Sequence, residues 1–343
     1  MSYNAQLVEQ ALQDIQKAIS STSVDGLMLV REDLQAEMAI MAPTDTPLRN
    51  RLNRIQGNGK AHAWYQLIPT ISAGAQSAGH LFLGGTAPED AFFAKGGLPT
   101  ATLPSYVYKS APYVSVGDLA TVSFFEQMAG GTYTDIKKHQ IKTKMLNVAL
   151  IEEWAIINGD SSVSPLQFDG LVKQITTNIK DNANAALALS DITAVCKQIV
   201  RKGGKPQAVI VGYRELQKIS ELVLSSYYRL FQAGAGTMAD IPAGISVTKW
   251  LSPFGVVDII GTRYIVEVAG GTTGAPTSQS VALVIDDKTV LEDGNAIQMV
   301  DLMPLSAIDL ALLQSAYRTL IAEFSVLQLT CEAFQGAITN IGE

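Results

Sequence analysis

The side chains that most often bind metals or act as nucleophiles are few and scattered in this sequence. Its two cysteines, Cys196 and Cys331, stand far apart among apolar residues, and its histidines, His62, His80 and His139, are isolated. Neither a Cys-x-x-Cys pair nor a His-Glu-x-x-His motif occurs, so no two ligands have metal-binding spacing. We therefore expect no metal, cofactor or catalytic site.

The glycine patterns typical of enzymes point the same way. The sequence has no Gly-x-Ser-x-Gly nucleophile turn, no Gly-x4-Gly-Lys-Ser/Thr phosphate loop and no Gly-x-Gly-x-x-Gly fingerprint that follows a strand. The nearest glycine-rich segment is QAGAGTMAD at 232–240, which we interpret as a polar connector. A small α/β hydrolase or transferase is kept as the alternative from the enzyme class.

Basic residues gather in two places. The net charge of −7 opposes tight binding to nucleic acid, which needs a basic face to neutralise phosphates. We interpret both clusters as solvated or salt-bridged faces, with loose contact to nucleic acid as the second interpretation. The first cluster is Arg49, Arg51, Arg54 and Lys60, and the second is Lys137, Lys138, Lys142 and Lys144 with His139.

The 343-residue chain is long enough for two lobes and unusually poor in charge. Charged residues make up 17% of it and hydrophobic residues 47%, whereas globular proteins average about 25% charged. No segment has the roughly 20 apolar residues of a membrane-spanning helix, and the N-terminus lacks the basic and apolar regions of a secretory signal. We expect a soluble protein part of whose surface is covered by something other than water.

Residues 61–108 combine strand-like ends with a long, charge-poor middle. AHAWYQLIP and SYVYKSAPYVSV are rich in aromatic and β-branched residues, and only Glu89, Asp90 and Lys95 are charged in the whole segment. A connection longer than about 15 residues is usually functional or disordered. We predict a long hairpin that other copies of the chain hold in order.

A long helix follows over 135–157, with Thr134 as its predicted N-cap. Lysines crowd its first half, and Glu152 and Glu153 occupy its last turn, which is the reverse of what the helix dipole favours. Partners outside the helix should therefore compensate, and we expect carboxylates of a neighbouring subunit to face the lysines. Asn158-Gly159 should end the helix in a left-handed conformation.

The rest of the chain predicts an α/β lobe and a closing strand. A helix capped by Ser190 and stopped by Gly203-Gly204, the buried strand QAVIVG and the helix YRELQKISELVL lead to several further strand patterns. The segment YRTLIAEFSVLQLTCEAF is apolar on both faces, which is typical of a strand buried between layers.

In this order, the parts resemble the major capsid proteins of tailed bacteriophages, with their Hong Kong 97-type fold. The residues that carry the resemblance are TDTPLRNRLNRIQGNGKAHAWYQ, EEWAIINGDSSVSPLQFDGLV and SPFGVVDIIGTRYIV. The resemblance implies an α+β fold with an N-terminal arm over 1–60 and an extended β-hairpin loop over 61–113. It further implies a peripheral domain with a long spine helix over 114–165 and 300–343, and an axial α/β domain over 166–299.

The resemblance also implies function and partners. The chain would assemble into hexamers and pentamers of an icosahedral shell around a double-stranded DNA genome, in the virion, after assembly in the host cytoplasm. The sequence lacks the long, highly charged N-terminal extension that some members use as a built-in scaffold, so the resemblance implies a separate scaffolding protein or a very short internal one. A portal, a decoration protein and loose contact with packaged DNA are further implied partners. A nanocompartment shell of the encapsulin type is the alternative within the same fold.

Assembly would depend on the charge-poor hairpin lying across a neighbour, although core packing within one subunit is an equal alternative for each aromatic residue. Some capsid relatives crosslink a loop lysine to an asparagine, and here Lys95 and Asn340 are the candidates, without a supporting local motif. The predicted intersubunit contacts are Trp64, Tyr65, Phe82, Phe92, Phe93, Lys95, Tyr106, Tyr108, Lys137, Lys138 and Lys142.

Overall fold

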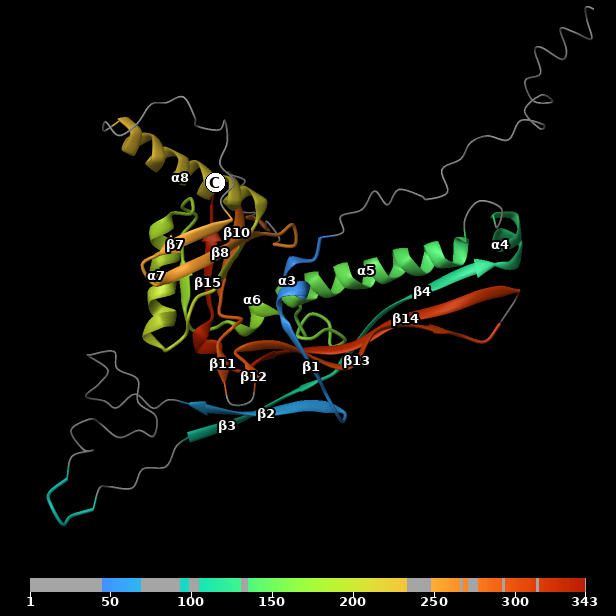
Figure 1. Ribbon diagram of the computed structural model, residues 1–343, viewed down its shortest axis with the longest axis horizontal. Helices are drawn as coiled ribbons and strands as arrows, with labels where there is room; N and C mark the ends of the chain where they lie inside the picture. Colours follow the sequence, from blue (N-terminus) through green and yellow to red (C-terminus); the bar gives the residue numbers. More distant parts are fainter. Residues whose placement is uncertain are drawn as a thin grey trace, which may run out of the picture.

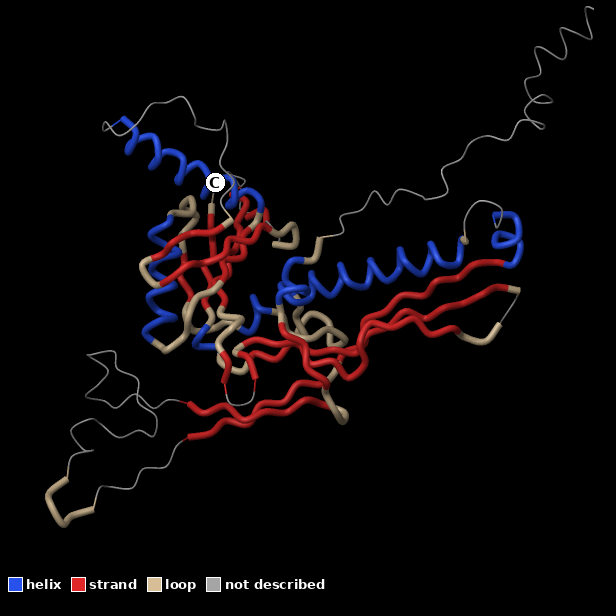
Figure 2. The backbone as a smooth tube through the Cα atoms, in the orientation of Figure 1, coloured by secondary structure: helices blue, strands red, loops and turns tan. Residues whose placement is uncertain are grey.

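A computed structural model describes residues 45–68, 93–98, 105–130, 135–232, 248–265, 268–270, 277–291, 294–312 and 315–342. They form an elongated half, built on one long helix and a four-stranded sheet, and a compact lobe built on a seven-stranded sheet (Figure 1). A separate two-stranded hairpin, β2 (Ala61–Ile68) with β3 (Ser105–Pro112), extends below both (Figure 2).

The elongated half is built on α5 (Ile136–Asn158), a helix of 23 residues and so about 34 Å long. It lies along a sheet in which β14 pairs antiparallel with β13 on one side and with β4 on the other, and α4 (Phe124–Gly130) follows β4 at the far end. Ala120, Val148 and Ile321 form the buried contact between helix and sheet. In order across the sheet, the strands are β1 (Asn53–Gln56), β13 (Ile297–Asp309), β14 (Ala316–Leu329) and β4 (Val114–Ser123).

The compact lobe has a sheet of order β5-β15-β10-β6-β8-β7, with β9 paired to β10. All four residues of β6 are buried, as its apolar run predicts. The helices α7 (Leu189–Arg201) and α8 (Tyr213–Gln232) pack on this sheet. The strands are β5 (Ile179–Asp181), β6 (Ala208–Val211), β7 (Lys249–Ser252), β8 (Gly255–Gly261), β9 (Val268–Gly270), β10 (Thr277–Ile285) and β15 (Gly336–Ile341).

One hydrophobic core joins the two halves. It includes Leu48 from the short helix α3 (Pro47–Arg51), Ile156 from α5, and Leu283 from the lobe sheet. Because these residues share one cluster, the two halves are not separated by a linker. The remaining elements are α6 (Leu171–Gln174), η3 (Glu332–Phe334), and the two-stranded pair β11 (Val290–Leu291) and β12 (Gly294–Asn295).

Three details of the sequence prediction are corrected. Asp135, and not Thr134, caps α5, because its carboxylate accepts a hydrogen bond from the Lys138 N–H. Ser190 does not cap α7; that helix follows Ala188, whose N–H donates to the carboxylate of Asp191. Residues 336–341, which the resemblance placed with 114–165, form β15 in the lobe sheet, where they pair with β10 and β5.

The stop at the end of α5 is confirmed, but not its predicted conformation. Gly159 has φ −55° and ψ 137°, so it is not left-handed. The Gly170 N–H donates to the Gly159 carbonyl at 2.8 Å, which closes the intervening segment into a loop. A Cβ on Gly159 would lie 2.3 Å from the Phe168 carbonyl oxygen, and one on Gly170 would lie 2.7 Å from that of Ala155. The motif needs glycine for close backbone approach.

Several expectations lie outside the described residues. They include most of the predicted arm, residues 1–44, together with Phe82 and Phe92. The connection between β2 and β3 is described only over 93–98.

Replacing Gly159 with alanine should destabilise the protein by about 1–3 kcal/mol, because the new methyl group overlaps two carbonyl oxygens that cannot both move. Denaturant unfolding of the full chain measures this. Ser161→Ala, in the same loop at an exposed position, is the matched control and should stay within about 0.5 kcal/mol. Equal stability of both variants would contradict the close-approach explanation.

Candidate assembly surfaces

The two faces of the β2–β3 hairpin differ. Tyr65 and Tyr108 stand opposite each other in the register, with ring centroids 5.4 Å apart, and are 65% and 59% exposed. Trp64, the residue before Tyr65, is 9% exposed. It lines a cavity of about 410 Å³ together with Phe168 and Leu327, which lie outside the hairpin. Side chains alternate across a strand, so the tyrosines face away from the body and Trp64 faces it.

Three more of the predicted hairpin contacts, Phe93, Lys95 and Tyr106, fall within the described residues. Phe93 and Lys95 are exposed in the described turn at 93–98. Tyr106 lies on β3 opposite Leu67. Asn340 on β15 donates from its side-chain amide to Asp181 at 2.9 Å, so in this chain the crosslink candidate is already hydrogen-bonded.

The lysines of α5 have mostly intrachain partners. The Lys137 ammonium lies 2.9 Å from Asp309 and over the ring of Tyr317, and that of Lys144 lies 2.9 Å from Asp118. For these two residues the chain itself supplies the carboxylates that we expected from a neighbouring subunit. The Lys138 side chain is 84% exposed, and its ammonium lies 3.3 Å from the helix cap Asp135. Lys142 is exposed and forms no ion pair with the residues that the structure describes.

The sheet of the elongated half has one covered and one open face. Its inner face packs on α5, and its outer face carries every second residue of β4, namely Ser115, Gly117, Leu119 and Thr121, all exposed and uncharged. Leu119, Leu320 and Ile308 form one row across the three strands β4, β14 and β13. Leu119 and Ile308 are both more than two-fifths exposed. This outer face therefore carries an apolar row that is partly open to solvent, beside the uncharged outward residues of β4.

The first arginine cluster is salt-bridged, as its preferred interpretation states, and it is largely buried. Arg49 from α3 contacts Glu152 and Glu323, and Arg54 from β1 contacts Glu152, Glu323 and Asp301. The Arg54 Nη1 atom lies 2.5 Å from Glu323 Oε1 and 3.0 Å from Asp301 Oδ2. Neither Glu152 nor Glu323 is exposed to solvent. One chain segment thus ties together α5, β13 and β14.

Two neighbouring contacts extend this junction. Arg51 binds Asp287 at 2.7 Å and Asp258 at 2.8 Å, which connects α3 to the lobe. The carboxylate of Glu153 accepts hydrogen bonds from the backbone N–H groups of Leu48 at 2.9 Å and Arg49 at 2.6 Å. The expectation that the glutamates at the end of α5 have partners outside the helix is therefore confirmed, and the partners belong to the same chain.

Burial and charge shift the ionisation of these groups. Burial raises the pKa of Glu152 to about 7, with repulsion from Glu323 adding to the shift and the two arginines opposing it. Burial also raises the pKa of Asp301, against the attraction of Arg54. For Arg54, burial lowers the pKa, but the surrounding carboxylates outweigh it and the net shift is upward. The arginine remains charged, and Glu152 and Asp301 hold protons more readily than in water.

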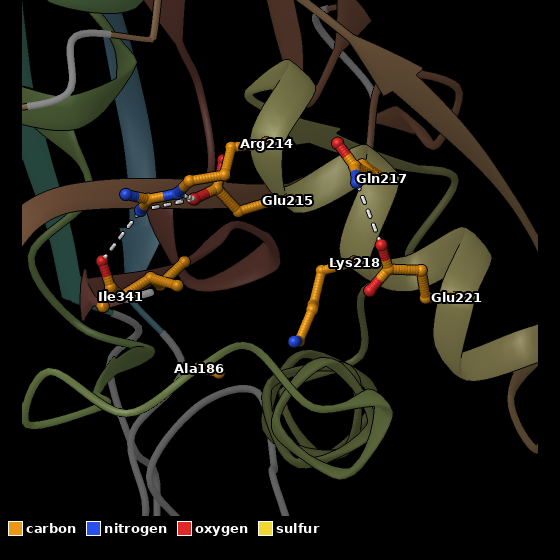
Figure 3. A pocket seen from close by; sticks show the side chains of 8 residues that line it. Ala186, Arg214, Glu215, Gln217, Lys218, Glu221 and Ile341 are labelled. Atoms are coloured by element: carbon orange, nitrogen blue, oxygen red, sulfur yellow. Dashed lines mark hydrogen bonds and ion pairs between the residues drawn. The ribbon is translucent and has the colours of Figure 1, made fainter. Parts of the chain in front are cut away.

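One cavity in the lobe is lined by charged and polar side chains. This cavity, of about 290 Å³, lies between the start of α8 and the end of β15 (Figure 3). Arg214 donates to Glu215 and to the Ile341 carbonyl, and Gln217 donates to Glu221. The lining contains no serine, cysteine or histidine. Across the described ranges, no group of three metal-binding side chains occurs, and no helix is long and apolar enough to cross a membrane.

Replacing Arg54 with methionine should destabilise the protein by about 3–5 kcal/mol, since Glu152, Glu323 and Asp301 would lose a shared cation while staying buried. Lys142→Met removes an exposed cation with a similar stem and should change stability by less than about 0.5 kcal/mol. Denaturant unfolding at pH 7 compares the two. Similar effects in both variants would mean that the cluster does not hold the junction.

Comparison with known proteins agrees with the architecture. The sequence matches the model of a family described as SU10 major capsid protein over residues 15–341. No curated protein matches the chain.

Solved structures share the fold at low sequence identity. The capsid of a native GTA particle superposes with a TM-score of 0.62 at 10% identity, over 94% of this chain and 99% of that one. The capsid of Myoviridae phage XM1 gives 0.55 at 13% identity, over 90% and 97%. The SrpI encapsulin of Synechococcus elongatus PCC 7942 gives 0.60 at 11% identity, over 93% and 95%.

These neighbours confirm the predicted Hong Kong 97-type capsid fold. The likeness to solved structures shows the fold alone. The family model also shows the kind of protein, because it matches nearly the whole sequence and describes major capsid proteins. The chain belongs to the SU10 major capsid protein family.

Proposed function

We propose that this capsid shell protein assembles into hexamers and pentamers of an icosahedral shell that encloses the double-stranded DNA of a tailed bacteriophage. The observation that carries the proposal is the family match over 15–341. The open apolar surfaces of the chain support it, since a protein that stayed monomeric would leave them in water.

The hairpin and the outer face of the sheet form a candidate pair of contacting surfaces. In one chain, His62 of the hairpin lies 2.9 Å from Gln328 of β14, so the base of the hairpin covers the inner end of that sheet. The distal part, with the row Leu119, Leu320 and Ile308, has no described element over it (Figure 1). In the shell, a neighbour's hairpin would cover it and bury the Tyr65–Tyr108 pair.

The division of labour between the two halves follows from the same proposal. The seven-stranded lobe, from 166–299 together with β15, would surround the centre of each hexamer or pentamer. The elongated half, from 114–165 and the strands β13 and β14, would point outward to neighbouring rings. Heterologous contacts close into rings when their rotation allows, which suits copies of one chain around an axis.

Other partners are part of the proposal. A separate scaffolding protein would guide assembly in the host cytoplasm, and a portal and a decoration protein are further candidate partners. Lys138 and Lys142, exposed on α5, are the candidates for loose contact with packaged DNA. Since the net charge is −7, such contact would be weak and sensitive to salt.

The second candidate function is an encapsulin-like compartment that holds protein cargo. Its support is the fold likeness to the SrpI encapsulin, which is as close as that to the phage capsids. The family match favours the capsid. Purified shells that contain DNA favour the capsid, whereas shells filled with one co-purifying enzyme favour the compartment.

The double variant Tyr65→Ser, Tyr108→Ser should raise the concentration needed for shell formation at least about tenfold, which corresponds to 1.4 kcal/mol of lost contact per subunit. Stability of the unassembled chain should not change, because both rings are exposed in it. Sedimentation and negative-stain microscopy, with and without the scaffold, measure assembly. Val163→Ser, at an apolar loop position that is 82% exposed, is the matched control. Normal shells from the double variant would refute the hairpin contact; no shells from the unaltered chain under any condition would refute the proposed function.

A further inference from the structure

The arginine cluster has more buried carboxyl groups than cations. Glu152, Glu323 and Asp301 share the two guanidinium groups of Arg49 and Arg54. With every group ionised, this set carries one uncompensated negative charge. Solvent cannot neutralise it, since Glu152 and Glu323 are fully buried and Asp301 is 6% exposed.

Among the residues that the structure describes, no other group near the cluster supplies the missing positive charge. On α5, Glu153 adds a further carboxyl, which α3 binds through backbone N–H groups and not through a cation. Asp45, at the entry to α3, interacts unfavourably with Glu153. From the lobe, the Tyr264 phenol interacts electrostatically with Glu153, Asp45 and Arg263. Arg51 is already bound by Asp287 and Asp258.

A buried uncompensated charge is removed most easily by binding a proton. The unfolded chain has no such requirement, because its carboxyls ionise in water near their ordinary values. The folded state therefore binds one proton more than the unfolded state at mildly acidic pH. As the pH rises through neutrality, the folded state loses this proton and the stability that came with it.

We propose that Glu152 and Asp301, which bind Arg54 together with Glu323, hold one proton between them at near-neutral pH, and that release of this proton loosens the grip of α3 and β1 on α5, β13 and β14. The cluster is then a proton-controlled clamp. It acts where the N-terminal segment joins the body at Asp45, so it sets how firmly that junction is held. The inference does not depend on shell assembly, since every group belongs to one chain.

The direction and size of the effect follow from the ionisation of Glu152. Its pKa is raised to about 7, so its proton stabilises the folded state fully below the ordinary carboxyl range and is lost as the pH rises through 7. Local opening of residues 45–56 should become about tenfold more favourable between pH 6 and pH 8, because one extra bound proton changes the equilibrium about tenfold per pH unit below the pKa of about 7 and almost not at all above it.

Hydrogen exchange of the unassembled full chain, followed by mass spectrometry, tests the clamp. After correction for the intrinsic pH dependence of exchange, protection of peptides from 45–56 should fall about tenfold from pH 6 to pH 8. Protection of β6, in the lobe core, should change less than twofold. Glu152→Gln makes the cluster neutral at both pH values and should abolish the fall. Asp301→Asn removes the same charge from β13 and replaces this test if Glu152→Gln does not fold.

Glu332→Gln is the matched control. Glu332 is a partly buried carboxylate outside the cluster. Burial raises its pKa, but hydrogen bonds from Thr176 and Thr177 outweigh burial, so the net shift of the pKa is downward. This variant should keep the tenfold fall in 45–56. The proposal is overturned if the unaltered chain shows less than a twofold fall there, if β6 loses protection equally, or if both cluster variants keep the full pH response.

Discussion

The contact on which the rest of the structure depends is the pairing of Arg49 and Arg54 with carboxyls at the end of α5. The helix α5 and the strands β13 and β14, which follow it more than 130 residues later, each bring an acidic side chain to the same buried place. Without the arginines these side chains would repel one another in a medium that screens poorly. The segment that carries the arginines also brings Leu48 into the core shared by both halves. Electrostatics and packing therefore position it together.

This junction explains why α5 can end in two glutamates. The negative end of the helix dipole disfavours them locally, by a few tenths of a kcal/mol to one each. Arg54 and the N–H groups of α3 reverse that preference through tertiary contacts. The sequence signalled that a partner was needed but not which one, because Arg54 lies 98 residues from Glu152. Charge pattern reveals a local misfit, whereas its resolution is long-range.

The same distinction separates what the sequence predicted from what it did not. Periodicity and turn residues predicted α5, β6 and β14, where local preference and burial agree. The place of β15 could not be predicted, because its neighbours β10 and β5 are chosen by pairing across the chain. The sequence predicted that α5 ends at Gly159, but not why a glycine is needed there, since no local pattern shows that the Phe168 carbonyl approaches it closely. The exposed pair Tyr65 and Tyr108 was predicted together with Trp64, because composition does not tell the two faces of a strand apart until register is known.

The sequence is poor in charged residues, and several of the charged residues it has are buried at the junction. The chain is only 17% charged, and the junction withdraws three arginines and several carboxyls from the surface. What remains outside is correspondingly poorer in charge, and the outward-facing residues of β4 are all uncharged. A monomer gains nothing from such a surface, because apolar area in water is unfavourable. In a shell, neighbouring copies would replace the water over this surface. Because the charged side chains at the junction are buried, the outer surface keeps the apolar area that assembly can bury.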